Sequence, residues 1–169
     1  MNVTEIERPK HHPKLDENAA FKIDKRFSII LNMNYQGMFA CGQNASHRSF
    51  LDQIPVRTPN VGYNVESAFY ATLNMLHKTV KFEYLPMERL TVGETEIYYY
   101  GERNGAYENY IVEGDINSDK FVVYYIRRGI VVGLLTFGYT NLHIYLIEAM
   151  KRLMLPTGKE LSSIINFRS

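Results

Sequence analysis

The hydrophobic and polar positions divide the first third of the chain into short pieces. Residues 21–24, 27–31 and 37–42 are brief, apolar or alternating stretches rich in aromatic and branched residues, which is typical of β-strands. The segment 44–62 carries two prolines and many polar residues, which predicts a loop. Residues 1–19 are mixed polar, which predicts an arm without a packed core of its own.

The pattern then changes to a helical one. Apolar and small residues recur at three- and four-residue spacing, which predicts an amphipathic helix that turns one face to the core. These positions are Val65, Ala68, Phe69, Thr72, Leu73 and Leu76. Asn64 is placed to cap the start of this helix, and the pair His77-Lys78 favours its last turn.

From residue 80 the period returns toward two, and strands are predicted at 82–85, 96–100, 108–113, 121–126 and 130–137. The connection Arg127-Arg128-Gly129 predicts an antiparallel hairpin, because glycine readily adopts the positive φ of a tight turn. The last two strands are nearly continuous apolar runs. Such runs are typical of a sheet that is covered on both faces.

Two helices are predicted at the end of the chain. Residues 141–155 are apolar over most of the helical circumference, so we expect this helix to be buried on two sides. Thr157 and Glu160 have the spacing of a capping box, and they predict the start of a second helix. Strands followed by helices of this kind predict an α+β fold with a small antiparallel sheet packed with helices.

Composition narrows the function classes. The chain has 169 residues, a net charge of +1 and one cysteine. The balanced charge argues against a nucleic-acid partner held by a strong positive field, and no nucleic acid is expected. A single cysteine excludes a disulfide framework or a cysteine-rich zinc site within this sequence. The sequence has no apolar run of about 18 residues, and we therefore expect no transmembrane segment.

Motifs that carry chemistry are missing from the sequence. Its glycines do not form a phosphate-binding loop, and it contains neither an H-E-x-x-H nor a G-x-S-x-G pattern. Cys41 lies in a small apolar piece and is expected to be a buried hydrophobic residue. His143 is expected to be a packed histidine with its polar atoms satisfied. Glu113 and Asp115 are expected to lie at a solvated strand end or turn. The sequence therefore predicts no catalytic residues and no metal site.

Tyrosine is unusually frequent, with 13 tyrosines and no tryptophan. Tyr98, Tyr99 and Tyr100 follow one another on a predicted strand, so both faces of that strand should present a ring. Tyrosines of this kind suit a protein–protein interface, because they combine a large apolar ring with a polar end. The alternative is that most of them are ordinary half-buried sheet residues.

Taken in order, several stretches resemble the C-terminal part of pyridine-nucleotide flavoprotein reductases of the apoptosis-inducing-factor-like and ferredoxin-reductase-like kind. Residues 14–24 and 37–45 (GMFACGQNA) are similar to the hairpin and strand that close the FAD domain, where the family has an Ala-x-Gly-Asp motif. Residues 60–78 are similar to the helix that follows, matched at Ala71, Asn74, Met75, Leu76 and Lys78. Residues 98–156 are similar to the C-terminal domain, best at 113–116, 120–125 and 131–135.

The resemblance implies a polar arm (1–19), a short remnant of the FAD-domain hairpin and strand (20–62) and a reductase C-terminal-like domain (63–169). It also implies flavin-dependent electron transfer from NAD(P)H, with FAD- and NAD-binding lobes expected upstream and not in this chain. The family's acidic residue, which contacts the flavin's ribityl–phosphate chain, corresponds to Gln43. An amide does not supply the same charge. Gly42 and Gln43 are thus the remaining candidates for a flavin contact, and no cofactor is expected.

Two hypotheses follow. The first is a non-catalytic structural or accessory subunit of a larger assembly, a pseudoenzyme whose partners are other protein subunits. The alternative is one part of a split FAD-dependent NAD(P)H oxidoreductase that another chain completes. The resemblance implies a mitochondrial location, while a ciliary or cytosolic assembly stays open.

Overall fold

The computed structural model of the chain describes residues 12–31, 37–101 and 107–168. It consists of two compact units. The first comprises Met1–Arg48 and Pro55–Glu83, and the second comprises Ser49–Ile54 and Tyr84–Ser169. The loop Ser49–Ile54 therefore belongs to the second unit, although the chain on both sides of it belongs to the first. The predicted ranges 1–19, 20–62 and 63–169 rest on the family resemblance, and they stay a prediction.

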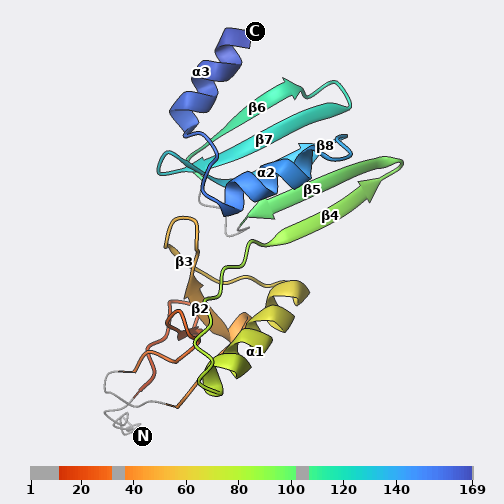
Figure 1. Cartoon of the computed structure of the whole chain (residues 1–169). Helices are drawn as coiled ribbons and strands as arrows, with labels where there is room; N and C mark the ends of the chain where they lie inside the picture. The colour runs from red at the N-terminus through yellow and green to blue at the C-terminus, as the bar shows by residue number, and fades with distance from the viewer. Residues whose placement is uncertain (1–11, 32–36, 102–106, 169) are drawn as a thin grey trace, which may run out of the picture. The chain divides into compact units, whose positions relative to one another are not determined.

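The first unit combines a small sheet with one long helix (Figure 1). Its elements are β1 (Phe21–Lys22), the short 3₁₀ helix η1 (Gly42–Asn44), β2 (Ala45–Arg48), β3 (Pro55–Val56) and α1 (Val61–Met75). The strand order is β1-β2-β3, with β1 parallel to β2 and β2 antiparallel to β3.

The short strands differ from those predicted. The segment 44–62, expected as a loop, contains β2 and β3. The pieces 27–31 and 37–42 are joined only by isolated β-bridges. Within the predicted arm, Pro13 and Leu15 form isolated β-bridges with Leu31 and Phe21 of this unit; residues 1–11 lie outside the described part of the chain. Sequence patterns missed β2 because Ala-Ser-His-Arg does not alternate between apolar and polar residues, although its first three residues are buried.

Helix α1 is confirmed, but its orientation is the reverse of the one predicted. Asn60 caps it in place of Asn64. The apolar stripe expected to face the core points away from it, and Phe69 is 61% exposed. The buried residues are instead Tyr63, Ser67, Ala71 and Asn74. The core of this unit is filled by large side chains of the preceding segments, Ile23, Phe27 and Ile29, with Ala71 as the small contribution of the helix.

The second unit is a regular antiparallel sheet with two helices, and the α+β prediction is confirmed (Figure 1). The strands are β4 (Met87–Val92), β5 (Thr95–Gly101), β6 (Asn109–Asp115), β7 (Lys120–Arg127) and β8 (Ile130–Phe137), in the order β4-β5-β8-β7-β6. The helices are α2 (Leu142–Lys151) and α3 (Gly158–Arg168).

The β7–β8 hairpin is confirmed, and Arg128 and Gly129 at its turn have φ of 53° and 78°. Two positive φ angles match the right-handed twist of the paired strands. Strand β4 was not predicted, and the expected strand at 82–85 is irregular. The apolar spacing that predicted a strand at 82–85 has another origin: Phe82 packs against the core of the first unit, and Leu85 lies in the core of the second. Strand β4 was missed because it is an edge strand with mostly exposed side chains.

The core of the second unit lies between the sheet and α2, which is drawn in front of the strands in Figure 1. Its buried residues are Leu51, Leu85, Tyr100, Val122, Tyr124, Val131, Leu134, Met150 and Leu161. Burial of α2 on two sides was wrongly predicted, since Ile144 is 50% and Tyr145 73% exposed. The opposite face of the sheet carries Val123, which is buried, and five partly exposed side chains, so this face is covered less completely than predicted. The partly exposed residues are Ile97, Tyr99, Phe121, Leu135 and Phe137.

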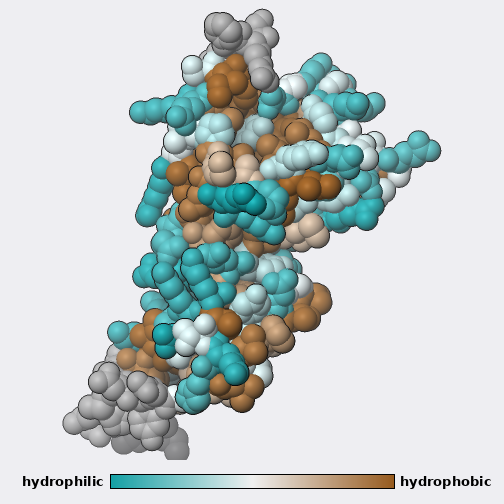
Figure 2. Space-filling view, in the orientation of Figure 1, coloured by the Kyte–Doolittle hydropathy of each residue, from teal (hydrophilic) through white to brown (hydrophobic). Residues whose placement is uncertain are grey.

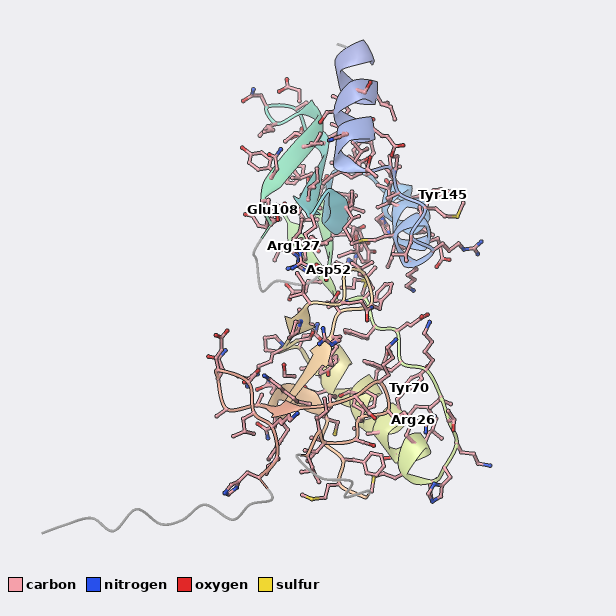
Figure 3. All side chains as sticks on the ribbon, turned by 90° about the vertical axis from the view of Figure 1, so that its left-hand side faces the viewer. Arg26, Asp52, Tyr70, Glu108, Arg127 and Tyr145 are labelled. Carbon is pink, nitrogen blue, oxygen red and sulfur yellow. The ribbon has the colours of Figure 1, made fainter. Side chains whose placement is uncertain are left out.

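Two polar features complete this unit. The Arg127 guanidinium donates through Nε to Asp52 Oδ2 at 2.5 Å, and both side chains are buried (Figure 3). The predicted capping box of α3 is confirmed, because the Thr157 amide donates to Glu160 Oε2 at 2.8 Å. Within the described residues, no helix is long and apolar enough to cross a membrane.

Candidate functional site

The Gly42–Gln43 pair lies in η1, where the chain passes beside α1 in the first unit. Gly42 has a φ of 67°, and a Cβ at this position would lie 3.1 Å from Asn64 Oδ1. Its amide donates to Ser67 Oγ at 3.1 Å, and Ser67 is fully buried. Glycine is required here because the backbone is left-handed and closely approached by a side chain.

The start of α1 is capped by the chain itself. The Tyr63 amide donates to the side-chain oxygen of Asn60 at 2.6 Å, which satisfies one of the free amides of the first turn. One turn further on, Asn64 Oδ1 is buried and has no hydrogen-bond partner among the described residues. A buried amide oxygen without a donor costs about 1–3 kcal/mol.

Gln43 is exposed, and its main chain is fixed by an arginine. Arg57 donates to the Gln43 carbonyl through Nε at 3.1 Å and Nη2 at 2.7 Å. It also donates through Nη1 to the Asn18 carbonyl at 3.4 Å. The guanidinium therefore links η1 to the segment before β1 by donating hydrogen bonds to main-chain carbonyls of both.

A buried aromatic pair lies next to this loop along the chain. His47 of β2 stacks on Tyr63 of α1 with ring centroids 4.8 Å apart, and His47 Nδ1 lies 2.9 Å from the Tyr63 hydroxyl. Burial lowers the pKa of His47 to about 4. Its imidazole is therefore neutral at physiological pH. No spacing rule of the sequence connects His47 with Tyr63, because the two residues lie 16 positions apart.

The residues around Gly42 do not fit a flavin by themselves. The space beside the Gly42 Cα is taken by Asn64, its amide is bound by Ser67, and the helix start is capped by Asn60. The position where the resemblance expects an acid carries the amide Gln43. The proposed flavin role of Gly42 and Gln43 therefore stays a prediction, and no reaction step is derived through a flavin.

Other candidate groups are scattered. Among the described residues, no three His, Cys, Asp or Glu side chains are grouped so that they would hold a metal ion. Cys41 is partly exposed beside η1, and the expectation of a buried cysteine in a strand was wrong. His143 is packed, stacked on Tyr98 with ring centroids 3.8 Å apart, but the prediction of a satisfied histidine was wrong, because its buried Nδ1 has no hydrogen-bond partner among the described residues.

The three consecutive tyrosines divide between the faces of the second unit's sheet, as predicted. Tyr98 and Tyr100 lie on the side of α2, where both stack with His143. Tyr99 lies on the opposite face and contacts Tyr125 at 5.9 Å between ring centroids. There it helps to line an open depression of about 390 Å³, whose other lining residues are Glu88, Arg89, Leu90, Ile97, Tyr107, Tyr125 and Leu135.

Comparison with known proteins shows the fold. No family model matches the sequence, and no curated protein matches it significantly. Among solved structures, putidaredoxin reductase in its covalent complex with putidaredoxin is similar, with a TM-score of 0.70 and 20% identity over 88% of this chain. An FAD-dependent pyridine nucleotide-disulphide oxidoreductase from Desulfovibrio vulgaris has a TM-score of 0.65 and 15% identity over 89% of the chain.

A ferredoxin reductase from Rhodopseudomonas palustris is also similar, with a TM-score of 0.64 and 13% identity over 82% of this chain. The likeness covers only 34%, 39% and 33% of these three structures, in the order given. The chain therefore spans about a third of the length of the reductases that it resembles. It has the fold of one part of a flavoprotein reductase.

Proposed function

We propose that this chain is a non-catalytic accessory subunit of a larger protein assembly, built on the C-terminal fold of a flavoprotein reductase. One observation carries the proposal. At the loop where the resemblance places a flavin contact, the polar groups of the main chain are bound by the chain's own side chains: Ser67 on Gly42, Arg57 on Gln43 and Asn60 on the helix start. The amides of Gly42 and Tyr63 and the carbonyl of Gln43 are therefore bonded inside the protein, and a loop with these groups engaged has fewer of them to offer a cofactor.

Exposed apolar surface supports a role in assembly. In the second unit, large hydrophobic side chains that are at least half exposed occur on β4 and α2. Scattered exposed apolar residues are normal, but contiguous patches mark interaction sites. The similar reductase is itself known in a complex with putidaredoxin. For the present chain, we propose protein subunits as partners.

The test is to purify the tagged full-length chain from its own cells and to measure the mass, subunit composition and visible absorbance of what it brings with it. We expect a defined complex with at least one other protein. Its absorbance near 450 nm should not rise with the amount of this chain. Flavin absorbance that rises one-to-one with this chain would replace the proposal with the alternative of a split NAD(P)H oxidoreductase. Recovery of the chain by itself would contradict both.

Matched glycine variants connect this test to the candidate loop. Gly42→Ala places a Cβ against Asn64, whereas Gly37→Ala meets nothing within 4 Å although Gly37 also has a positive φ of 120°. If flavin is bound at this loop, Gly42→Ala lowers the absorbance and Gly37→Ala does not. Under the accessory-subunit proposal, neither variant changes the visible spectrum.

A further inference from the structure

Helix α1 exposes its apolar face to solvent. Four large apolar side chains on this face are more than half exposed: Val61 at 78%, Val65 at 65%, Phe69 at 61% and Leu76, the C-cap residue, at 63%. With Thr72 they form a stripe along the whole helix, which we call the α1 stripe. The residues buried in the unit, Tyr63, Ser67, Ala71 and Asn74, lie on the opposite side of the helix. In Figure 2 a band of hydrophobic side chains follows α1 at the lower right.

This arrangement is the inverse of an ordinary surface helix. A helix at the surface normally turns its apolar stripe to the core and its polar residues to water. Here the unit uses the small and polar side of α1 for its own packing. The α1 stripe therefore contributes nothing to the core of the first unit, and a contiguous apolar strip remains available for another surface.

We infer that the α1 stripe is a dimer interface, at which the α1 helices of two copies of this chain pack antiparallel. The spacing of the stripe is symmetric about the midpoint between residues 68 and 69. In an antiparallel pair centred there, Val61 meets Leu76 of the second copy and Val65 meets Thr72. Phe69 meets Ala68, an exposed residue beside the stripe, so a large side chain lies opposite a small one. Both ends of the stripe then find an apolar partner.

Charge permits this pairing. Glu66 is the only charged residue of α1, and it lies at the edge of the exposed face. No like charges are therefore brought together along the stripe. The antiparallel orientation also places the partial positive end of each helix beside the partial negative end of the other.

The available area indicates how strong the contact is. Four of the five side chains are more than half exposed and Thr72 is also exposed, so at roughly 100 Å² per residue the stripe offers up to about 500 Å² per helix. Two copies then bury at most about 1,000 Å², which is at the lower limit for a specific interface. We therefore expect a reversible dimer that dissociates on dilution.

The inference goes beyond the proposed function and does not rest on it. Self-association is a property of the purified chain alone, whereas the accessory role concerns other proteins in the cell. A colourless complex with other subunits would support the proposed function even if the purified chain proved monomeric.

Sedimentation equilibrium of the purified full-length chain over a hundredfold range of concentration tests the inference. We expect the mass to rise from one chain to two, and Phe69→Glu to raise the dissociation constant at least tenfold. Ile116→Glu is the matched control, because Ile116 is also 62% exposed but lies in the second unit, and it should leave the dimer unchanged. The inference is contradicted if the chain stays monomeric, if it forms assemblies larger than a dimer, or if Phe69→Glu leaves the dissociation constant unchanged.

Cross-linking tests the orientation. In a Cys41→Ser background, Val61→Cys and Leu76→Cys should form a disulfide with each other when the two variants are mixed. Neither variant should cross-link to itself, because the antiparallel pair holds identical ends of α1 far apart. Self-cross-linking of each variant would indicate a parallel pair and would overturn the proposed geometry.

Discussion

The two units of the molecule are stabilised in different ways. In the first, strands of two to four residues carry little regular pairing, and many buried positions are polar: Ser46, His47, Thr58, Ser67 and Asn74. In the second, strands of six to eight residues form continuous antiparallel ladders over an apolar core. The first unit therefore depends on particular hydrogen bonds, and the second on repeated ladder bonds and packing.

The largest expected loss of stability is an exception to this comparison. It comes from a buried polar pair in the second unit, which otherwise depends on ladder hydrogen bonds and apolar packing. Asp52→Ala removes the buried partner of Arg127, whose Nη2 has no hydrogen-bond partner among the described residues even in the unchanged chain. Breaking such a pair costs about 3–5 kcal/mol, because a charge remains buried without compensation. Hydrogen exchange of the β7 and β8 amides measures the loss.

The control for Asp52→Ala is an exposed ion pair of the same unit. Glu148 interacts with Lys151 and Arg152 at the surface of α2, at 4.0 and 3.8 Å. Glu148→Ala should change the free energy of unfolding by less than about 1 kcal/mol. If Asp52→Ala costs no more than this control, the buried pair does not stabilise the second unit.

The next effect is the pH dependence of the first unit, and it sharpens the comparison. Above pH 6.5 the His47 imidazole is neutral in both folded and unfolded chain. Between pH 6.5 and about 4, the unfolded chain binds a proton that the buried ring excludes, so the free energy of unfolding falls. The full loss is about 3 kcal/mol. Amide exchange in α1 should follow this loss, and His47→Gln should abolish the dependence in this window.

His77 offers the control, since it is exposed at the end of α1. His77→Gln should leave the pH dependence of α1 exchange intact. A profile that His77→Gln flattens, or that His47→Gln leaves unchanged, would show that another group is responsible.

Sequence patterns predicted the second unit much better than the first, for a physical reason. Long runs such as 121–126 and 130–137 repeat one preference over many residues, and the turn at Arg128-Gly129 has its own local signal. In the first unit, the pairing of His47 with Tyr63 joins residues far apart in sequence. Helix α1 buries its small and polar face because large side chains of other segments already fill the core. The periodicity of the α1 sequence gives no information about those segments.

The candidate site shows the same division. Gly42 and Gln43 were found through a family resemblance, and the strain at Gly42 agrees with a need for glycine. The side chains that engage them, Ser67 and Arg57, had no signal in the sequence. Each comes from another segment, and serine and arginine at such positions are ordinary surface residues in any local window.

A smaller effect concerns backbone geometry in the second unit. Gly138 has a φ of 73°, and a Cβ there would lie 1.7 Å from the Asp119 carbonyl oxygen. Gly93 has a similar φ of 62° with nothing within 4 Å. Gly138→Ala should therefore cost about 2 kcal/mol more than Gly93→Ala, because it adds steric overlap to the same backbone strain. Equal losses in thermal unfolding would mean that the strand ends separate easily here.

The smallest effect compares helix caps. Asn60→Ala in the first unit and Thr157→Ala in the second each remove a side-chain cap and should cost about 1 kcal/mol. Asn141 precedes α2 without a side-chain cap bond, so Asn141→Ala should be nearly neutral. Denaturant titration of the three variants measures the difference. A loss for Asn141→Ala equal to the others would contradict the cap assignment.

The excursion of Ser49–Ile54 has a consequence for dissecting the protein. The polypeptide leaves the first unit at Arg48, contributes Asp52 to the second, and returns at Pro55 before it leaves again at Glu83. A single cut between residues 83 and 84 therefore separates neither unit intact. The C-terminal fragment lacks Asp52, the carboxylate that pairs with Arg127. The N-terminal fragment retains the loop with Leu51, an apolar residue whose core belongs to the other fragment. Proteolysis at that junction should yield two pieces that stay associated until they are denatured.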